Sequence, residues 1–190
     1  MTFRQAGRWF LTGATALFIS AANAQTERLA VCAGCHGADG NSALAGIPSL
    51  AGQPKVFLEN YLVMSREGVR GSEVMQKLLK GITDKEIVAL AVHFNGLKAK
   101  AIPGDTDPAM FKRGREVARK NHCGNCHMPN YHGQSQMPRL AGQREDFLAE
   151  SMFAYRQNRR PGGDTMMAAA LYGIPDADIK ALAHFLARSK

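Results

Sequence analysis

Apolar residues recur at helical spacing along most of the chain, and no stretch shows the strict alternation of a half-buried strand. The clearest apolar stripe lies near the C-terminus and consists of Ile179, Leu182, Ala183 and Leu186. Asp176 stands in front of this stripe as a candidate N-cap. Helices are predicted over residues 55–67, 83–97, 110–120, 143–158 and 176–187. The fold class predicted from these patterns is all-α.

The two halves of the chain repeat each other about 90 residues apart, as expected for a duplicated unit. The run Leu-Ala-Gly-Gln, for example, occurs at 50–53 and again at 140–143. Between the copies, Pro-Gly-Asp at 103–105 and Asp-Pro at 107–108 are turn and helix-breaking signals. The predicted organisation is therefore a first domain at 25–98, a linker at 99–107 and a second domain at 108–190.

The N-terminal segment has the pattern of an export signal. Arg4 and Arg8 precede an apolar run at 9–21, and Ala-Asn-Ala at 22–24 provides a small-x-small cleavage site. The run of about 13 residues is shorter than the roughly 20 that a membrane-spanning helix needs. Residues 1–24 are therefore predicted to be a cleaved signal peptide. The mature protein is then expected in the periplasm of a Gram-negative bacterium, without stable membrane insertion.

Basic residues outnumber acidic ones, with 24 Lys and Arg against 16 Asp and Glu and a formal net charge of +8. A solvated surface and steering toward an acidic partner protein both explain this excess, because the charges are spread along the chain. The nearest approach to a basic patch is formed by Lys112, Arg113, Arg115, Arg119 and Lys120. Export from the cytoplasm disfavours nucleic acid as the partner.

All four cysteines fall in two Cys-x-x-Cys-His motifs, at 32–36 and 123–127. Two thiols three residues apart on a helical turn can add to the two vinyl groups on one edge of a porphyrin. The histidine that follows is then placed under the iron. The motifs therefore predict two covalently bound haem c groups. The predicted attachment residues are Cys32, Cys35, Cys123 and Cys126, and the predicted proximal iron ligands are His36 and His127.

Two other uses of paired cysteines fit the sequence less well. In a four-cysteine zinc site, the two pairs are usually separated by about 15–20 residues. Here most of a domain lies between them. A thioredoxin-like redox site requires a βαβ context, which the helical pattern does not provide.

The repeat selects the second axial ligand of each iron. The chain has nine methionines, and only Met75 and Met167 occupy matching positions, each six residues before a Gly-Ile pair. Methionine is a frequent second ligand in electron-transfer haems. Met75 and Met167 are therefore predicted as ligands, with Met166 as the runner-up in the second half.

A histidine as the second ligand is the alternative that the sequence leaves open. His93 and His184 lie in the C-terminal helices of the two halves, but their register differs by one residue, which favours a packing or surface role. Pro48 and Pro138 follow the proximal histidines closely in sequence. Their carbonyl groups are candidate acceptors for the proximal Nδ1–H, and a simple turn is the alternative.

These motifs resemble a known family. The run Cys-x-x-Cys-His-Gly-Ala-Asp-Gly-Asn at 32–41, the Pro-x-Leu-Ala-Gly-Gln runs at 48–53 and 138–143 and the late methionines are similar to class I cytochromes c. The tandem arrangement resembles the di-haem cytochrome c4 family. This resemblance implies two cytochrome c domains related by a pseudo-twofold axis, each wrapped around a covalent haem c. It also implies haem propionates near the interface, fast electron exchange and service to a terminal oxidase.

The function predicted from these features is electron transfer, not enzyme catalysis. The predicted partners are redox proteins, either a membrane oxidase or reductase complex or a dehydrogenase subunit. The alternative function is an electron-accepting subunit of a periplasmic dehydrogenase that oxidises sulfide, thiosulfate or an alcohol. A peroxidase-like haem enzyme is a third hypothesis, and it requires an iron with a labile ligand.

Overall fold

The computed structural model describes residues 15–101, 104–160, 162 and 164–190. The helices are α1 (Thr15–His36), α2 (Lys55–Arg66), α3 (Glu73–Leu79), α4 (Asp84–Gly96), α5 (Pro108–Lys120), α6 (Cys123–His127), α7 (Glu145–Arg156), α8 (Thr165–Leu171) and α9 (Asp176–Arg188). Within the described residues there is no β-strand, and an isolated bridge joins Gln134 and Met137. The all-α prediction is confirmed.

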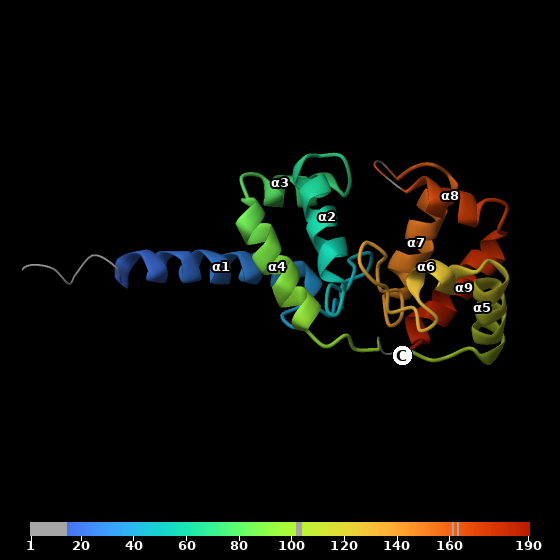
Figure 1. Cartoon of the computed structure of the whole chain (residues 1–190). Coiled ribbons are helices and arrows are strands. Elements are labelled where there is room, and N and C mark those ends of the chain that lie inside the picture. Colours follow the sequence, from blue (N-terminus) through green and yellow to red (C-terminus); the bar gives the residue numbers. More distant parts are fainter. Residues whose placement is uncertain (1–14, 102–103, 161, 163) are drawn as a thin grey trace, which may run out of the picture.

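Two groups of helices lie side by side, α2–α4 in one and α5–α9 in the other (Figure 1). In the first, α2 packs against α3 and α4, and in the second α7 packs in the same way against α8 and α9. The apolar stripes of the last helices form the centre of each core, with Ile87 and Leu90 in α4 and Ile179 and Leu182 in α9 all buried. The repeat in the sequence is therefore a repeat of the structure.

The five predicted helices correspond to α2, α4, α5, α7 and α9, with ends that differ by two residues or fewer. The prediction that Asp176 is an N-cap is wrong. Pro175 is the N-cap, with φ −60° and ψ 152°, and Asp176 is the first helical residue. The fixed φ of proline sets the direction in which the chain enters the helix. The carboxylate of Asp176 lies in the first turn, where its negative charge interacts favourably with the helix dipole.

Three short helices were not predicted. α6 has five residues, and α3 and α8 have seven each. A stretch this short contains too few turns to show a 3.6-residue period. Side-chain caps begin α3 and α8, because Ser72 accepts a hydrogen bond from the Met75 N–H and Asp164 accepts one from the Met166 N–H.

In the second domain, α5 packs closely along α9. A Cβ atom at Gly114 would lie 2.0 Å from the carbonyl oxygen of Ala181, so the contact requires a glycine at this position. Near this contact Phe111 packs edge-on against Phe185, with ring centroids 5.1 Å apart. The close approach buries the apolar face of α5 against the last helix.

Among the described residues of the first domain, no helix packs along α4 as α5 packs along α9, and α1 points away from the two groups of helices over its N-terminal part (Figure 1). Near its C-terminal end, α1 meets α4 through an ion pair between Arg28 Nε and Glu86 Oε1 at 3.4 Å. α1 is continuous through the predicted cleavage point after Ala24. Residues 1–14 of the predicted signal peptide lie outside the described residues, and its cleavage stays a prediction.

The segment between α4 and α5 is attached to both domains. Asn41 Nδ2 donates to the Lys98 carbonyl, and the Lys100 N–H donates to Asn41 Oδ1. At the other end, the Asp107 N–H donates to His184 Nε2 at 3.0 Å. Residues 102–103 of the predicted linker lie outside the described residues. The limits at 98 and 108 remain predictions.

Candidate functional site

The second Cys-x-x-Cys-His motif forms its own short helix, α6, and ends in a buried histidine. His127 is 3% exposed, and its Nδ1 lies 3.0 Å from the carbonyl oxygen of Pro138. Burial lowers the pKa of the His127 imidazole, and the bond to Pro138 partly offsets this effect. Because Nδ1 donates to the carbonyl, the neutral ring carries its lone pair on Nε2. This nitrogen is buried and has no hydrogen-bond partner among the described residues, as expected of a metal-ligating atom.

The first motif is built in the same way at the C-terminal end of α1. His36 is 7% exposed, and its Nδ1 lies 2.8 Å from the carbonyl oxygen of Pro48. Burial lowers the pKa of His36 as well. The interpretation of Pro48 and Pro138 as acceptors for the proximal histidines is confirmed. A carbonyl in this position fixes the tautomer and the orientation of the ring.

The cysteines are arranged for attachment to a prosthetic group, not for chelation of zinc. None of the four is in a disulfide. Burial raises the pKa of the Cys32 and Cys123 thiols. Among the described residues, no group of three or more His, Cys, Asp or Glu side chains converges as a metal site. The residues therefore fit a haem held through thioethers and a histidine.

The loop after each proximal histidine begins in the same way in both domains, with positive φ at its first and fourth residues, although the side chains differ. Gly37 has φ 85° in the first domain, and Met128 has φ 69° and ψ 154° at the matching position in the second. Similarly, Gly40 has φ 72° and Tyr131 has φ 58°. Positive φ suits glycine, so Met128 and Tyr131 are strained positions.

The two short helices α3 and α8 place the candidate methionine ligands. Met75 is partly buried against the first core together with Cys32, and Met167 is partly buried against the second core together with Cys123. Met166 is 75% exposed. The structure thus brings Met167, not Met166, to the core that carries the second motif. Iron ligation by Met75 and Met167 stays a prediction.

His184 was one candidate for a histidine as the second iron ligand, and in the structure it has other partners. Its Nε2 accepts from the Asp107 N–H, and its Nδ1 lies 3.2 Å from Glu145 Oε1. Both ring nitrogens are therefore engaged, Nε2 with the linker and Nδ1 with the first residue of α7. His132 directly precedes Gly133, whose N–H donates to the His127 carbonyl. His132 therefore lies beside His127, the predicted proximal ligand.

Two glutamines join the domains in a reciprocal arrangement. Gln143 Oε1 accepts from the Ser49 N–H at 2.8 Å, and its Nε2 donates to the Ser49 carbonyl at 2.9 Å. Gln53 makes the same pair of bonds to the N–H and carbonyl of Arg139, both at 2.9 Å. Ser49 and Arg139 directly follow the prolines that hold the proximal histidines. No role was predicted for these glutamines from the sequence, although both recur at the end of the Pro-x-Leu-Ala-Gly-Gln runs, which is a usable signal.

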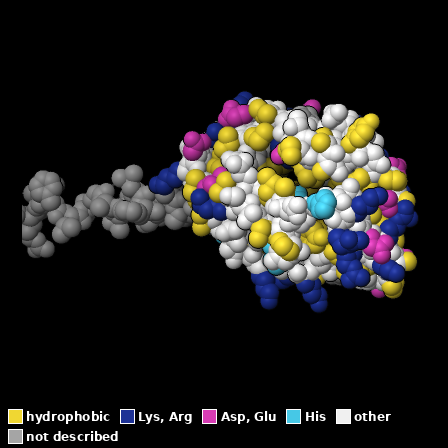
Figure 2. All heavy atoms as spheres, turned by 45° about the vertical axis from the view of Figure 1, so that its right-hand side comes forward, with side chains coloured by type: hydrophobic (Ala, Val, Ile, Leu, Met, Phe, Trp, Pro, Cys, Tyr) yellow, Lys and Arg dark blue, Asp and Glu magenta, His cyan; other side chains and the backbone are white. Residues whose placement is uncertain are grey.

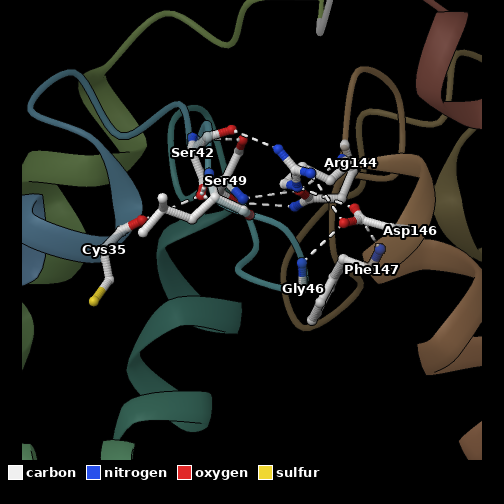
Figure 3. Close-up of polar contacts among 9 residues, drawn as sticks. Cys35, Ser42, Gly46, Ser49, Arg144, Asp146 and Phe147 are labelled. Atoms are coloured by element: carbon white, nitrogen blue, oxygen red, sulfur yellow. Dashed lines mark hydrogen bonds and ion pairs between the residues drawn. The ribbon is translucent and has the colours of Figure 1, made fainter.

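Further contacts extend this interface (Figure 3). Asp146 Oδ2 accepts from the Gly46 N–H at 2.8 Å, and Arg144 binds Asp146 and also donates to the Ser42 carbonyl. Ser42 Oγ in turn donates to the carbonyl of Cys35 in the first motif. The interface therefore reaches the backbone of the first haem-attachment motif.

Lys and Arg side chains gather over the second domain, on the side away from α1 (Figure 2). The five basic residues that the sequence analysis singled out all lie exposed on α5: Lys112, Arg113, Arg115, Arg119 and Lys120. Arg113 is paired with Asp178 across the α5–α9 contact. Among the described helices, none is both long and apolar enough to cross a membrane.

The fold and the two motif sites define a pair of c-type haem domains, and comparison with known proteins agrees. The family model for Cytochrome c matches residues 21–93 and 111–190. Cytochrome c4 from Stutzerimonas stutzeri is 32% identical over 186 residues, with 87% of each chain covered. The crystal structure of reduced cytochrome c4 from Pseudomonas stutzeri superposes with a TM-score of 0.80 at 30% identity, covering 89% of this chain and 98% of that one. The chain belongs to the di-haem cytochrome c4 family.

A second group of relatives has a more specific description. The thiosulfate dehydrogenase electron acceptor of Stutzerimonas stutzeri (strain A1501) is 29% identical, with 94% of each chain covered. The structure of thiosulfate dehydrogenase from Marichromatium purpuratum matches 84% of this chain with a TM-score of 0.70 at 30% identity, and the match covers 36% of that longer chain. Two covalently bound haem c groups and an electron-carrying role follow for this chain from its motifs and its family.

Proposed function

We propose that this protein is a periplasmic electron carrier that donates electrons toward a terminal oxidase. The observation that supports this most directly is the equivalence of the two sites. Each has a buried histidine whose Nδ1 is held by a proline carbonyl, and the two sites are docked to each other through Gln53 and Gln143. A carrier of this kind holds one electron per domain and needs two fixed, similar sites in contact.

The residues of the chain support rapid transfer by remaining in place. A bound haem c supplies an iron that alternates between Fe(II) and Fe(III). The bonds from His36 and His127 to proline carbonyls prevent ring rotation between the two states. Met75 and Met167, partly buried on α3 and α8, are proposed as the second iron ligand of each domain. An iron held by both a histidine and a methionine would have no position free for a substrate.

Periplasmic location is part of the proposal. The N-terminal part of α1 leaves the first domain, which supports removal of residues 1–24 without loss of the core (Figure 1). The exposed basic residues of α5 are proposed to steer the protein toward an acidic redox partner. Rates of electron transfer to such a partner are expected to fall as ionic strength rises, because salt screens exposed charges.

The second candidate function is electron acceptor for a thiosulfate dehydrogenase. It is favoured by relatives with that description in Thiomonas intermedia and Stutzerimonas stutzeri, which cover most of this chain. In this role the haem domains take electrons from a catalytic subunit and pass them on. The chemistry within each domain is the same in both roles, and the donor differs.

Stopped-flow kinetics with the purified di-haem protein distinguish these roles. The reduced protein is mixed with membranes that contain a terminal oxidase, and the oxidised protein is mixed with thiosulfate and a thiosulfate dehydrogenase. Rapid, inhibitor-sensitive oxidation by the membranes supports the oxidase as acceptor. Rapid reduction only in the presence of the dehydrogenase, with slow oxidation by membranes, overturns the first proposal in favour of the second.

A further inference from the structure

Each proximal histidine is bonded to a peptide group whose other side is held by the opposite domain. In the first domain, the peptide between Pro48 and Ser49 accepts from His36 Nδ1 through its carbonyl at 2.8 Å. The N–H of the same peptide donates to Gln143 Oε1 in the second domain, also at 2.8 Å. A continuous chain of hydrogen bonds therefore runs from one domain to the histidine of the other.

The second domain has the mirror arrangement. The peptide between Pro138 and Arg139 accepts from His127 Nδ1 at 3.0 Å and donates to Gln53 Oε1 at 2.9 Å. The same chain of bonds thus occurs twice and crosses the interface in opposite directions. A chance contact does not explain this repetition. We refer to each histidine, peptide and glutamine as a relay.

The orientation of each glutamine amide is fixed. Gln143 Nε2 donates to the Ser49 carbonyl, so its Oε1 must face the Ser49 N–H. Gln53 is fixed in the same way by its bond to the Arg139 carbonyl. Gln53 is 4% exposed and Gln143 5%, so water has little access to compete for these bonds. Hydrogen bonds are electrostatically stronger in such an interior than in water.

The physical effect of the relay has a definite sign. A hydrogen bond accepted from the peptide N–H shifts electron density onto the carbonyl oxygen of that peptide, because bonds in a chain polarise one another. The carbonyl then accepts more strongly from the histidine Nδ1–H, which makes the imidazole a stronger electron donor to a metal on Nε2. A stronger donor stabilises Fe(III) relative to Fe(II) and lowers the reduction potential.

We propose that Gln143 lowers the reduction potential of the haem in the first domain, and that Gln53 lowers that of the haem in the second. Both glutamines are positioning residues that act through a peptide group. The proposal rests on the proposed function of His36 and His127 as iron ligands. By thermodynamic linkage, oxidation of either haem tightens the docking of the two domains by the same free energy.

The test replaces one glutamine with a residue of similar length that cannot accept a hydrogen bond in this way, Gln143→Met. The potentials of the two haems are measured separately by following the assigned haem methyl resonances in a redox titration by NMR. Each bond in a chain is strengthened by roughly 10–30%. We therefore expect the equilibrium for reduction of the first-domain haem to increase about threefold, which is about 30 mV at 59 mV per tenfold for one electron. The second-domain haem is expected to change much less.

The mirror variant, Gln53→Met, is expected to raise the potential of the second-domain haem instead. This crossed pattern separates the relay from a general loosening of the interface, which would affect both haems in each variant. The matched control is Tyr155→Phe, which removes the hydrogen bond from Arg70 across the same interface and leaves the charge unchanged. Equal shifts in Tyr155→Phe and Gln143→Met, or a shift in the haem of the mutated domain, would overturn the proposal.

The wild-type protein provides a test that does not depend on the variants. The Ser49 and Arg139 amides lie in loops, yet each donates to a buried glutamine, so their hydrogen exchange is expected to be slow. Exchange at the rate of free loop amides would show that the relay is absent in solution. Failure of the relay leaves the histidine ligation untouched, because the ligands are identified separately from the spectra of the ferric protein.

Discussion

Gln143 in the second domain holds the backbone of Ser49 in the first through two hydrogen bonds, accepting from its N–H and donating to its carbonyl. The pair is buried, with Gln143 5% and Ser49 6% exposed. The main-chain groups of Ser49 therefore depend on a side chain of the other domain for their partners. The contact makes the two haem domains one unit.

The first prediction is that Gln143→Ala uncouples the domains. Leaving the buried N–H and carbonyl of Ser49 without partners is expected to cost about 2 kcal/mol of unfolding free energy. Calorimetry of the variant is expected to show two transitions where the wild type shows one. The control is Asp146→Asn, which weakens the exposed bond to Gly46 and is expected to cost less than about 1 kcal/mol. Equal losses of unfolding free energy in the two variants would contradict the claim that the buried bonds of Gln143 stabilise the protein more than the exposed bond of Asp146.

The second prediction concerns the strained residue after His127. Met128 has φ 69° and ψ 154°, a region that glycine adopts freely and other residues adopt at a cost. Met128→Gly is therefore expected to stabilise the protein by about 1 kcal/mol, measured by chemical unfolding. The matched change in the other domain, Gly37→Ala, is expected to destabilise, because a Cβ there would lie 2.4 Å from the Asn41 carbonyl oxygen.

The loop after His127 shows which features could be predicted from the sequence and which could not. The repeat predicted two equivalent domains. It did not predict that Met128 and Tyr131 would follow the backbone of Gly37 and Gly40. Bonds from Leu140 and Ala141 to the Tyr131 carbonyl impose this path. Tyr131 also packs edge-on against Phe185, so tertiary contacts override the local preference.

The site itself was largely predictable because covalent haem attachment uses a fixed local motif. His36 and His127 are where the motif places them, and their proline acceptors follow from the repeat. The bonds of Gln53 and Gln143 were not predictable in the same way. They join residues far apart in sequence, and pairing of that kind is set by how the two domains dock.

The third prediction tests the close approach of α5 and α9. A Cβ at Gly114 would lie 2.0 Å from the Ala181 carbonyl oxygen and 2.6 Å from Phe185 Cβ. Gly114→Ala is expected to push the helices apart and lower the unfolding free energy by about 2–3 kcal/mol in a denaturant titration. Gly96→Ala in α4 meets no atom within 4 Å and is expected to have little effect. A small loss for Gly114→Ala would show that the helices are not in close contact.

The fourth prediction follows from Asp39, which binds Lys100 of the predicted linker. The side-chain hydrogen bond from Lys100, with that from the Asn41 backbone, lowers the pKa of Asp39 from 3.8 to about 2. A carboxylate with a lowered pKa stabilises the folded state above its unfolded pKa, and the contribution is lost as pH falls through the folded value. Asp39→Asn is therefore expected to lower stability at pH 5 and above. The difference from wild type should shrink as pH falls toward 2 and vanish below that value. A difference that stays constant from pH 5 to below pH 2 would argue against the Asp39–Lys100 pair.

The fifth prediction concerns the central claim, that both irons carry a histidine and a methionine and so transfer electrons without binding substrate. It is tested most directly by the methionine-to-iron charge-transfer band of the ferric protein, measured by near-infrared magnetic circular dichroism. Wild type is expected to show the intensity of two methionine-ligated irons, and Met75→Ala or Met167→Ala half of it. Met166→Ala should match the wild type, because Met166 is 75% exposed. Full intensity in Met75→Ala or Met167→Ala, or a wild-type band of half strength, would contradict the account.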